Sequence, residues 1–218
     1  MKLVRYALLV LVCLTILYGS WLMLCLSYPY LSFDKHTDFL MTKQLIYHIK
    51  TWRISFYIHV FVSTGVLIAG LFQFSTYLIK YKPALHRFLG KTYVFVILFF
   101  SGPSGLIMSY YANGGVWAKT SFIILSLLWL ISTAYGWYYA VARKWQLHLN
   151  MMLRSYFLTL SALTLRTYAY LIVFFNIPLQ PKMAYILIAW LSWSLNLLVA
   201  EIIIRRRWAN RVVSFQMA

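Results

Sequence analysis

The stretch from Tyr6 to Tyr28 reads YALLVLVCLTILYGSWLMLCLSY and contains no charged residue. A helix of about 20 apolar residues crosses the ~30 Å hydrocarbon core of a bilayer. Five further stretches share this character, and the set predicts transmembrane spans over residues 6–28, 53–78, 89–111, 117–142, 152–175 and 183–204. Because backbone polar groups in lipid need internal partners, we expect an all-α bundle forming a single domain over residues 1–218.

The composition supports a membrane protein. Of the 218 residues, 63% are hydrophobic and 11% are charged, whereas a soluble domain is about a quarter charged. A chain of this size cannot bury so much apolar surface in water. The composition therefore excludes a soluble enzyme, a secreted disulfide scaffold and a disordered chain. The two cysteines, Cys13 and Cys25, have no metal-site spacing.

The basic residues predict an orientation. Twenty Lys and Arg accompany three Asp and Glu, and they cluster at the ends of the apolar stretches. This pattern is typical of membrane topology and of contact with anionic headgroups, and it argues against a nucleic-acid partner. Thirteen basic residues lie at one set of span ends and six at the other. The positive-inside rule then predicts that both termini are cytoplasmic.

Two histidines begin two of the spans. His86 precedes span three, where Gly90 and Tyr93 follow on the same helical face, and His148 precedes span five. Two imidazoles at one depth are what a bis-histidine haem b or a metal ion requires. The alternative is that both are interfacial histidines among basic anchors.

The neighbours of these histidines suit the first interpretation. Arg87 and Arg154 are placed to hold haem propionates, and Tyr93 to line the pocket. We therefore predict a cofactor site that consists of His86, His148, Arg87, Arg154 and Tyr93.

A second polar group lies within the spans. His59 and Gln73 belong to one stripe of small and polar residues along span two, which faces other helices. Arg166 lies inside span five, where a charge is costly and normally functional. Its partner is left open between Asp34 or Asp38, backbone carbonyls, and an anionic ligand such as a haem propionate or a quinone. Glu201 is expected to meet Arg205, one turn along the same helix, or the basic cluster at the inner span ends.

Span three contains Ser101-Gly102-Pro103-Ser104-Gly105 near its middle. Proline removes a backbone donor, so we expect a kink that serves helix packing, and carbonyls freed toward Arg166 are a testable alternative. Residues 29–52 are polar and mixed in charge, and they are compatible with a loop, a surface helix or a lid.

The run from Phe72 to Tyr170 resembles a family of predicted bacterial membrane proteins, domain of unknown function 2306. The motifs are His86-Arg87-x-x-Gly90-x-x-Tyr93, Ser101-Gly102 with Gly105, and His148-x-x-x-Met152-x-Arg154-Ser155 leading to Leu165-Arg166. The resemblance implies a small multi-pass protein of the bacterial plasma membrane, without an established activity. Histidines at span ends are also similar to membrane cytochromes of the b type, although only His59, His86 and His148 lie in or at spans.

Two functions follow as hypotheses. The first is a haem- or metal-binding redox protein that uses His86 and His148. The second is a non-enzymatic membrane protein, such as a small transporter, a sensor partner or a complex-assembly factor, with a polar intramembrane site at His59 and Arg166. No nucleotide loop, nucleophile elbow or paired intramembrane carboxylates occur, so catalytic residues, substrate and oligomeric state stay open.

Overall fold

The computed structural model describes residues 2–206, and it is helical throughout its regular elements. Within this part of the chain, six segments are long and apolar enough to cross a membrane. They run over Ala7–Ser32, Lys50–Gln73, Pro83–Tyr110, Val116–Val141, Trp145–Phe174 and Pro181–Arg205. The predicted all-α architecture with six spans is therefore confirmed.

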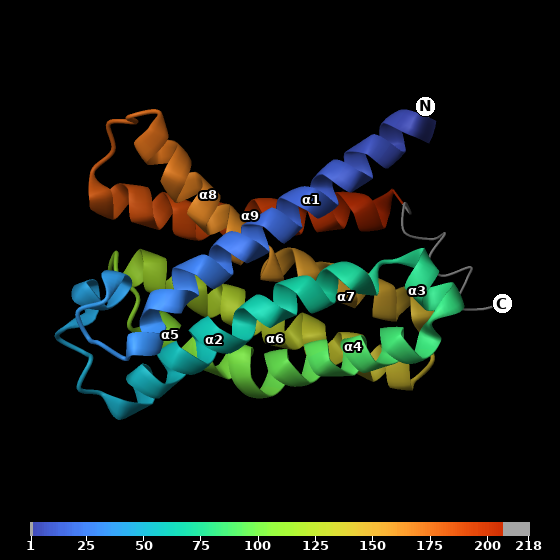
Figure 1. Ribbon diagram of the computed structural model, residues 1–218, viewed down its shortest axis with the longest axis horizontal. Coiled ribbons are helices and arrows are strands. Elements are labelled where there is room, and N and C mark those ends of the chain that lie inside the picture. Colours follow the sequence, from blue (N-terminus) through green and yellow to red (C-terminus); the bar gives the residue numbers. More distant parts are fainter. Residues whose placement is uncertain (1, 207–218) are drawn as a thin grey trace.

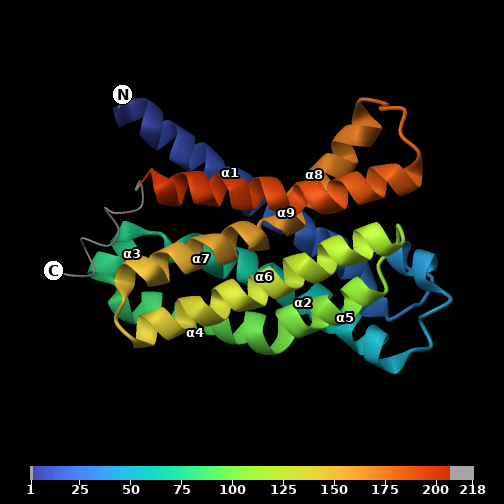
Figure 2. The same cartoon turned by 180° about the vertical axis from the view of Figure 1, so that it is seen from behind.

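The spans form two groups. Helices α2 (Lys50–Gln73), α4 (Pro83–Val96), α5 (Gly102–Tyr110), α6 (Val116–Val141) and α7 (Trp145–Thr159) make a bundle (Figure 1). Helices α8 (Ser161–Phe174) and α9 (Pro181–Arg205) lie along one side of it, and α1 (Lys2–Ser27) crosses obliquely (Figures 1 and 2). The main core is a buried cluster contributed by α2, α4, α6, α7 and α9 and the segments that adjoin them: Val66, Tyr93, Val94, Ile97, Trp129, Met152, Tyr156, Leu158 and Trp193.

The two ends of the bundle differ in chemistry. At one end lie the starts of α4 and α7, the end of α9 and the short helix α3 (Thr76–Tyr81) (Figure 1). Lys80, Lys82, Arg87, Lys91 and Arg205 belong to this end, which we call the basic end. Residues 28–49 lie at the opposite end, which we call the lid end (Figure 1).

The third span is interrupted where a kink was expected. A π-helical turn, η3 (Ile97–Ser101), separates α4 from α5, and the Gly102 N–H donates to the carbonyl of Ile97 five residues earlier. Pro103 lies at the start of α5, where it has no N–H to donate. The alternative in which freed carbonyls meet Arg166 is not what the described residues show, because the Arg166 guanidinium donates to the Ala162 carbonyl and the Ser101 carbonyl lies within hydrogen-bond distance of His59.

Two spans begin earlier than the sequence indicated. Helix α4 starts at Pro83 and α7 at Trp145, whereas apolar character alone placed the starts at 89 and 152. The first turn of each helix is polar, so apolar character alone did not reveal where the helix starts. Proline at a first helical position is favoured because the N–H there has no intrahelical acceptor. His86 and His148 are consequently held on regular helix, one turn from each start.

The lid end is closed by residues 28–49, which we call the lid. The lid contains two 3₁₀ turns, η1 (Tyr28–Ser32) and η2 (Asp38–Lys43). Its Leu40 is 0% exposed, and packs with Tyr30, Trp52 and Phe56 in a second apolar cluster. Of the three conformations that the sequence left open, the segment therefore adopts a folded cover over the ends of the spans.

Candidate functional site

A cavity of about 340 Å³ lies at the basic end, between α2, α4, α6 and α7. Both histidines of the predicted cofactor site line it, although they are far apart in the sequence. Its wall consists of Gln73, Phe74, Ile79, Pro83, His86, Arg87, Gly90, Lys91, Val94, Trp137, Ala140, Trp145, His148, Leu149 and Met152.

His148 has a defined ring orientation. Its Nδ1 lies 2.8 Å from the carbonyl oxygen of Gly136 on α6, so Nδ1 carries the proton and donates it. In the neutral imidazole the other nitrogen, Nε2, is then an acceptor, and it has no hydrogen-bond partner among the described residues. The Trp145 ring meets the imidazole edge to face, with centroids 6.4 Å apart. The imidazole is thus half-buried and oriented by the backbone of the neighbouring helix.

His86 is held from α2. With the Gln73 amide oriented to suit its neighbours, its NH₂ donates to the His86 carbonyl at 3.3 Å and its oxygen accepts the Gly90 N–H at 3.2 Å. A Cβ at Gly90 would lie 2.9 Å from this amide, so glycine is needed for the approach. The two imidazoles are close enough to interact electrostatically.

The charge of the cavity wall is positive. Arg87 and Lys91, one helical turn apart on α4, are the charged residues among its lining, and no carboxylate lines it. Phe74, Trp137 and Trp145 supply aromatic surface. A cavity with apolar walls, a few convergent polar groups and this volume is of the kind that binds small molecules. Its charge favours an anionic ligand.

Two residues of the predicted site lie elsewhere. Tyr93 is 1% exposed, and its hydroxyl contacts Ser155 Oγ and Thr159 Oγ1, each at 2.9 Å. Arg154 pairs with Glu201 through Nε–Oε1 at 2.5 Å and Nη2–Oε2 at 3.0 Å. The expectations that Tyr93 lines the pocket and that Arg154 faces it are wrong.

The Arg154–Glu201 pair decides between the two expected partners of Glu201, which were Arg205 and the basic cluster at the inner span ends. Arg154 belongs to that cluster. Helix α7 presents it at the depth of Glu201, and the planar guanidinium binds both carboxylate oxygens. Arg205 contributes only a weaker electrostatic interaction.

The predicted polar intramembrane group divides between two places. His59 and Arg166 are near enough to interact electrostatically, on the lid side of the span middles. Gln73 lies at the other end of α2, in the wall of the basic-end cavity. Helix α2 keeps both residues on its inner face, but about 20 Å of helix separates them.

Several wall residues were not predicted, namely Phe74, Lys91, Trp137, Trp145 and Met152. Helical spacing offered a signal for three of them. Lys91 follows Arg87 by four residues, Met152 follows His148 by four, and Trp145 precedes His148 by three. Trp137 had no such signal, because it comes from the end of α6 and reaches the cavity only through the packing of α6 on α7.

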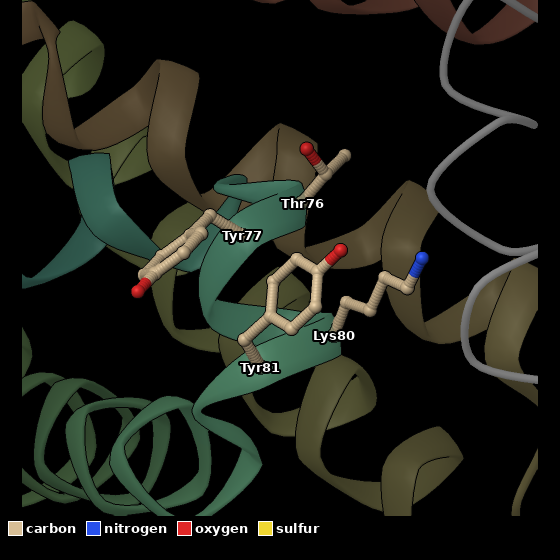
Figure 3. Close-up of a pocket in the computed structure, with 4 residues that line it drawn as sticks. All are labelled: Thr76, Tyr77, Lys80 and Tyr81. Carbon is tan, nitrogen blue, oxygen red and sulfur yellow. The ribbon is translucent and has the colours of Figure 1, made fainter.

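A second hollow, of about 260 Å³, lies on α3 and is lined by Thr76, Tyr77, Lys80 and Tyr81 (Figure 3). The Lys80 ammonium lies 5.1 Å from the centroid of the Tyr81 ring, and the Tyr77 and Tyr81 rings are 5.3 Å apart. Both tyrosines are exposed. Aromatic and basic side chains of this kind are typical of the headgroup region, so we regard the hollow as a surface feature of the interface.

No group of three or more His, Cys, Asp or Glu side chains able to hold a metal ion occurs within residues 2–206. The comparisons with known proteins identify one family. The model of DUF2306, described as a predicted membrane protein, matches residues 56–204. The match covers the whole of the basic-end cavity. No curated protein and no solved structure matches the chain.

Proposed function

The chain belongs to the DUF2306 family of predicted membrane proteins, and we propose that its basic-end cavity binds haem b between His86 and His148. The observation that carries this proposal is the convergence of the two imidazoles from α4 and α7 on one cavity. The protein is then a membrane redox protein, which we place in the bacterial plasma membrane.

The hydrogen bond at His148 supports a ligand role. Histidines that bind a metal almost always donate their other ring N–H to a carbonyl or a carboxylate, which fixes the tautomer and the ring plane. The Nδ1–H of His148 donates to Gly136 in this way, so Nε2 is free to bind iron. His86 belongs to a helix turn that Gln73 holds through the backbone.

The basic residues of the cavity wall support an anionic ligand, and its aromatic residues support a flat one. Arg87 and Lys91 are suited to hold the propionates. Lys91 takes the role first assigned to Arg154, whose guanidinium is occupied by Glu201. Phe74, Trp137 and Trp145 provide apolar contacts for the ring and exclude water from it. Exclusion of water and hydrogen bonding around the ligands are the means by which a protein adjusts the potential of a haem.

Bound haem would supply one-electron chemistry. The chain's own residues would have three roles. His86 and His148 would bind the iron, and Arg87 and Lys91 would neutralise the charge of the propionates. The aromatic side chains would shield the ring from water. The two histidine side chains are chemically suited to haem, because neutral imidazole is a common axial ligand.

An absorption spectrum tests the proposal. We expect the detergent-purified protein to show a haem spectrum that sharpens and shifts on reduction with dithionite. H86A and H148A should each lose at least about nine-tenths of the haem per chain, because each removes an axial ligand. H36A is the matched control, since His36 is exposed on the lid and its loss should leave the haem content unchanged.

Two results would contradict the haem proposal. A flat visible spectrum of the wild-type protein after incubation with haemin, with the protein monodisperse on size exclusion, would overturn the proposal. So would full haem content in monodisperse H86A and H148A.

The second candidate is a non-enzymatic membrane protein, such as a small transporter, a sensor partner or a complex-assembly factor. The observation that favours it is Arg166, a cation within a span that has no carboxylate partner among residues 2–206. Transport of an anionic solute predicts uptake into vesicles that is lost in R166Q and kept in H148A. A redox protein with haem at the basic end predicts no such uptake.

A further inference from the structure

Gly136 on α6 contacts two residues of the basic-end cavity without lining the cavity itself. Its carbonyl oxygen accepts the Nδ1–H of His148 at 2.8 Å. The nearest neighbour in the direction of a side chain is Met152, one turn further along α7. Both His148 and Met152 belong to the cavity wall. Gly136 is therefore placed to act on the site through these two side chains.

The contact with Met152 leaves no room for a side chain on Gly136. A Cβ at this position would lie 2.5 Å from Met152 Sδ and 3.2 Å from Met152 Cγ. Non-bonded carbon atoms are about 3.5–4.0 Å apart at their optimum separation. Both residues are buried, Met152 with 6% of its surface exposed. An added methyl group at residue 136 consequently requires Met152 to move.

The surroundings of Met152 set the direction of this movement. On its inner side Met152 packs in the main core with Tyr93, Tyr156 and other buried residues. On another side it borders the cavity of about 340 Å³. Methionine is unbranched and has three rotatable bonds, so its thioether changes position at low cost. A Cβ on Gly136 is therefore expected to turn the thioether into the cavity.

A displaced thioether would lie beside the proposed iron ligand. Met152 follows His148 by four residues on α7, so the two side chains are neighbours on one helical face. The Nε2 of His148 is the nitrogen that the cavity leaves for a ligand. The close packing of Met152 on Gly136 thus keeps the space next to this nitrogen clear.

We propose that Gly136 is a positioning residue of the haem site. Its carbonyl fixes the imidazole of His148, and its lack of a side chain holds Met152 against α6 and out of the space that the ligand occupies. The inference rests on the proposed function, because it explains how room for haem is kept beside His148. Gly136 acts through His148 and Met152, and it does not contact the ligand.

Haemin titration of four proteins tests the proposal: the wild type, G136A, M152A and G136A/M152A. G136A should weaken haemin binding at least about tenfold, because the displaced thioether overfills the site. In the M152A background the new Cβ meets no thioether, and Met151 Cβ lies at an ordinary 3.7 Å. There G136A should change the affinity by less than about twofold.

G65A is the matched control, since its Cβ has nothing within 4 Å, and it should bind haemin as the wild type does. Equal affinities of the wild type and G136A would overturn the proposal. An equal loss from G136A in both backgrounds would do the same. So would a lowered melting temperature of G136A with wild-type affinity, because glycine would then serve helix packing alone.

A measurement without haem separates this inference from the haem proposal. The methionine methyl groups of the haem-free protein are isotope-labelled and observed by NMR, and the Met152 signal is identified by its absence in M152A. We expect G136A to shift this signal and G65A to leave it in place. Where the wild type binds no haemin, the haem proposal fails and the Met152 signal decides: a shift supports the control of Met152 by Gly136, and an unchanged signal overturns it.

Discussion

Lys43 shows how one side chain holds the lid in place. It is 4% exposed, and its Nζ donates to the Tyr111 carbonyl and to Asn113 Oδ1, each at 2.6 Å. Burial, with a smaller effect from Lys119, lowers the pKa of Lys43 to about 8. The lysine therefore joins η2 to the loop between α5 and α6 at the expense of desolvating its charge.

The lowered pKa predicts a pH dependence of stability. The unfolded chain holds this proton up to about pH 10.5 and the folded chain up to about pH 8. Between these values the unfolded state binds more protons, so the contribution of Lys43 to stability rises with pH. We expect the difference in melting temperature between wild type and K43M to be larger at pH 10 than at pH 7.5, by at least about 2 °C.

The matched control is K35M, which removes an exposed lid lysine and should give the same difference at both pH values. A pH-independent difference for K43M would contradict a lowered pKa.

At the scale of the element, α2 is the helix that carries both His59 and Gln73. Its inner stripe places His59 beside the π-turn and Gln73 beside the basic-end cavity. Between them Gly70 allows Tyr93 and Tyr156 to pack against the backbone: a Cβ there would lie 2.4 Å from the Tyr156 ring and 2.8 Å from that of Tyr93. The Tyr156 hydroxyl also donates to the Leu67 carbonyl at 3.2 Å. A small residue thus sets the distance of α2 from its neighbours.

A pair of glycine substitutions tests this dependence. G70A should destabilise the folded protein by about 1–3 kcal/mol, because two rigid rings must move. G65A lies on the same helix with nothing within 4 Å of its new Cβ, so it should be neutral or slightly stabilising. Thermal unfolding in one detergent measures both. Equal melting temperatures for the two variants would show that α2 can shift without cost.

At the scale of the whole molecule, orientation decides which compartment each site faces. In the sequence, thirteen Lys and Arg lie at the span ends on the basic side and six at those on the lid side. We predict that the basic end, with the histidine cavity, faces the cytoplasm and that the lid faces outward. Electrons at a haem near the basic end would then exchange with cytoplasmic partners.

Labelling in intact cells tests the orientation. In a chain whose Cys13 and Cys25 are replaced by alanine, we expect a membrane-impermeant maleimide to label K35C on the lid and to spare K144C at the basic end. Permeabilised cells should label both, which controls for reactivity. Labelling of K144C alone in intact cells would show that the chain is inserted the other way.

The features of the fold that were predicted are those that depend on residues close together in the sequence. The spans, the interruption near Pro103 and the inner stripe of α2 were predicted, because hydrophobic length, proline and helical spacing act within one or two turns. The starts of α4 and α7 were missed, because their first turns are polar although they continue the helix. The division of the fifth span at Leu160 between α7 and α8 had no local signal.

The sequence by itself determined that this protein is a bundle of membrane-spanning helices, because six apolar stretches of about 20 residues each match the length of a helix that crosses the bilayer and satisfies its own backbone. Only the tertiary structure decided which polar side chains meet. It paired Arg154 with Glu201, buried Tyr93 in a hydroxyl network and moved Gln73 from the Arg166 group to the His86 cavity. The physical reason is that each encounter depends on the rotation and depth of two helices, which interhelical packing sets.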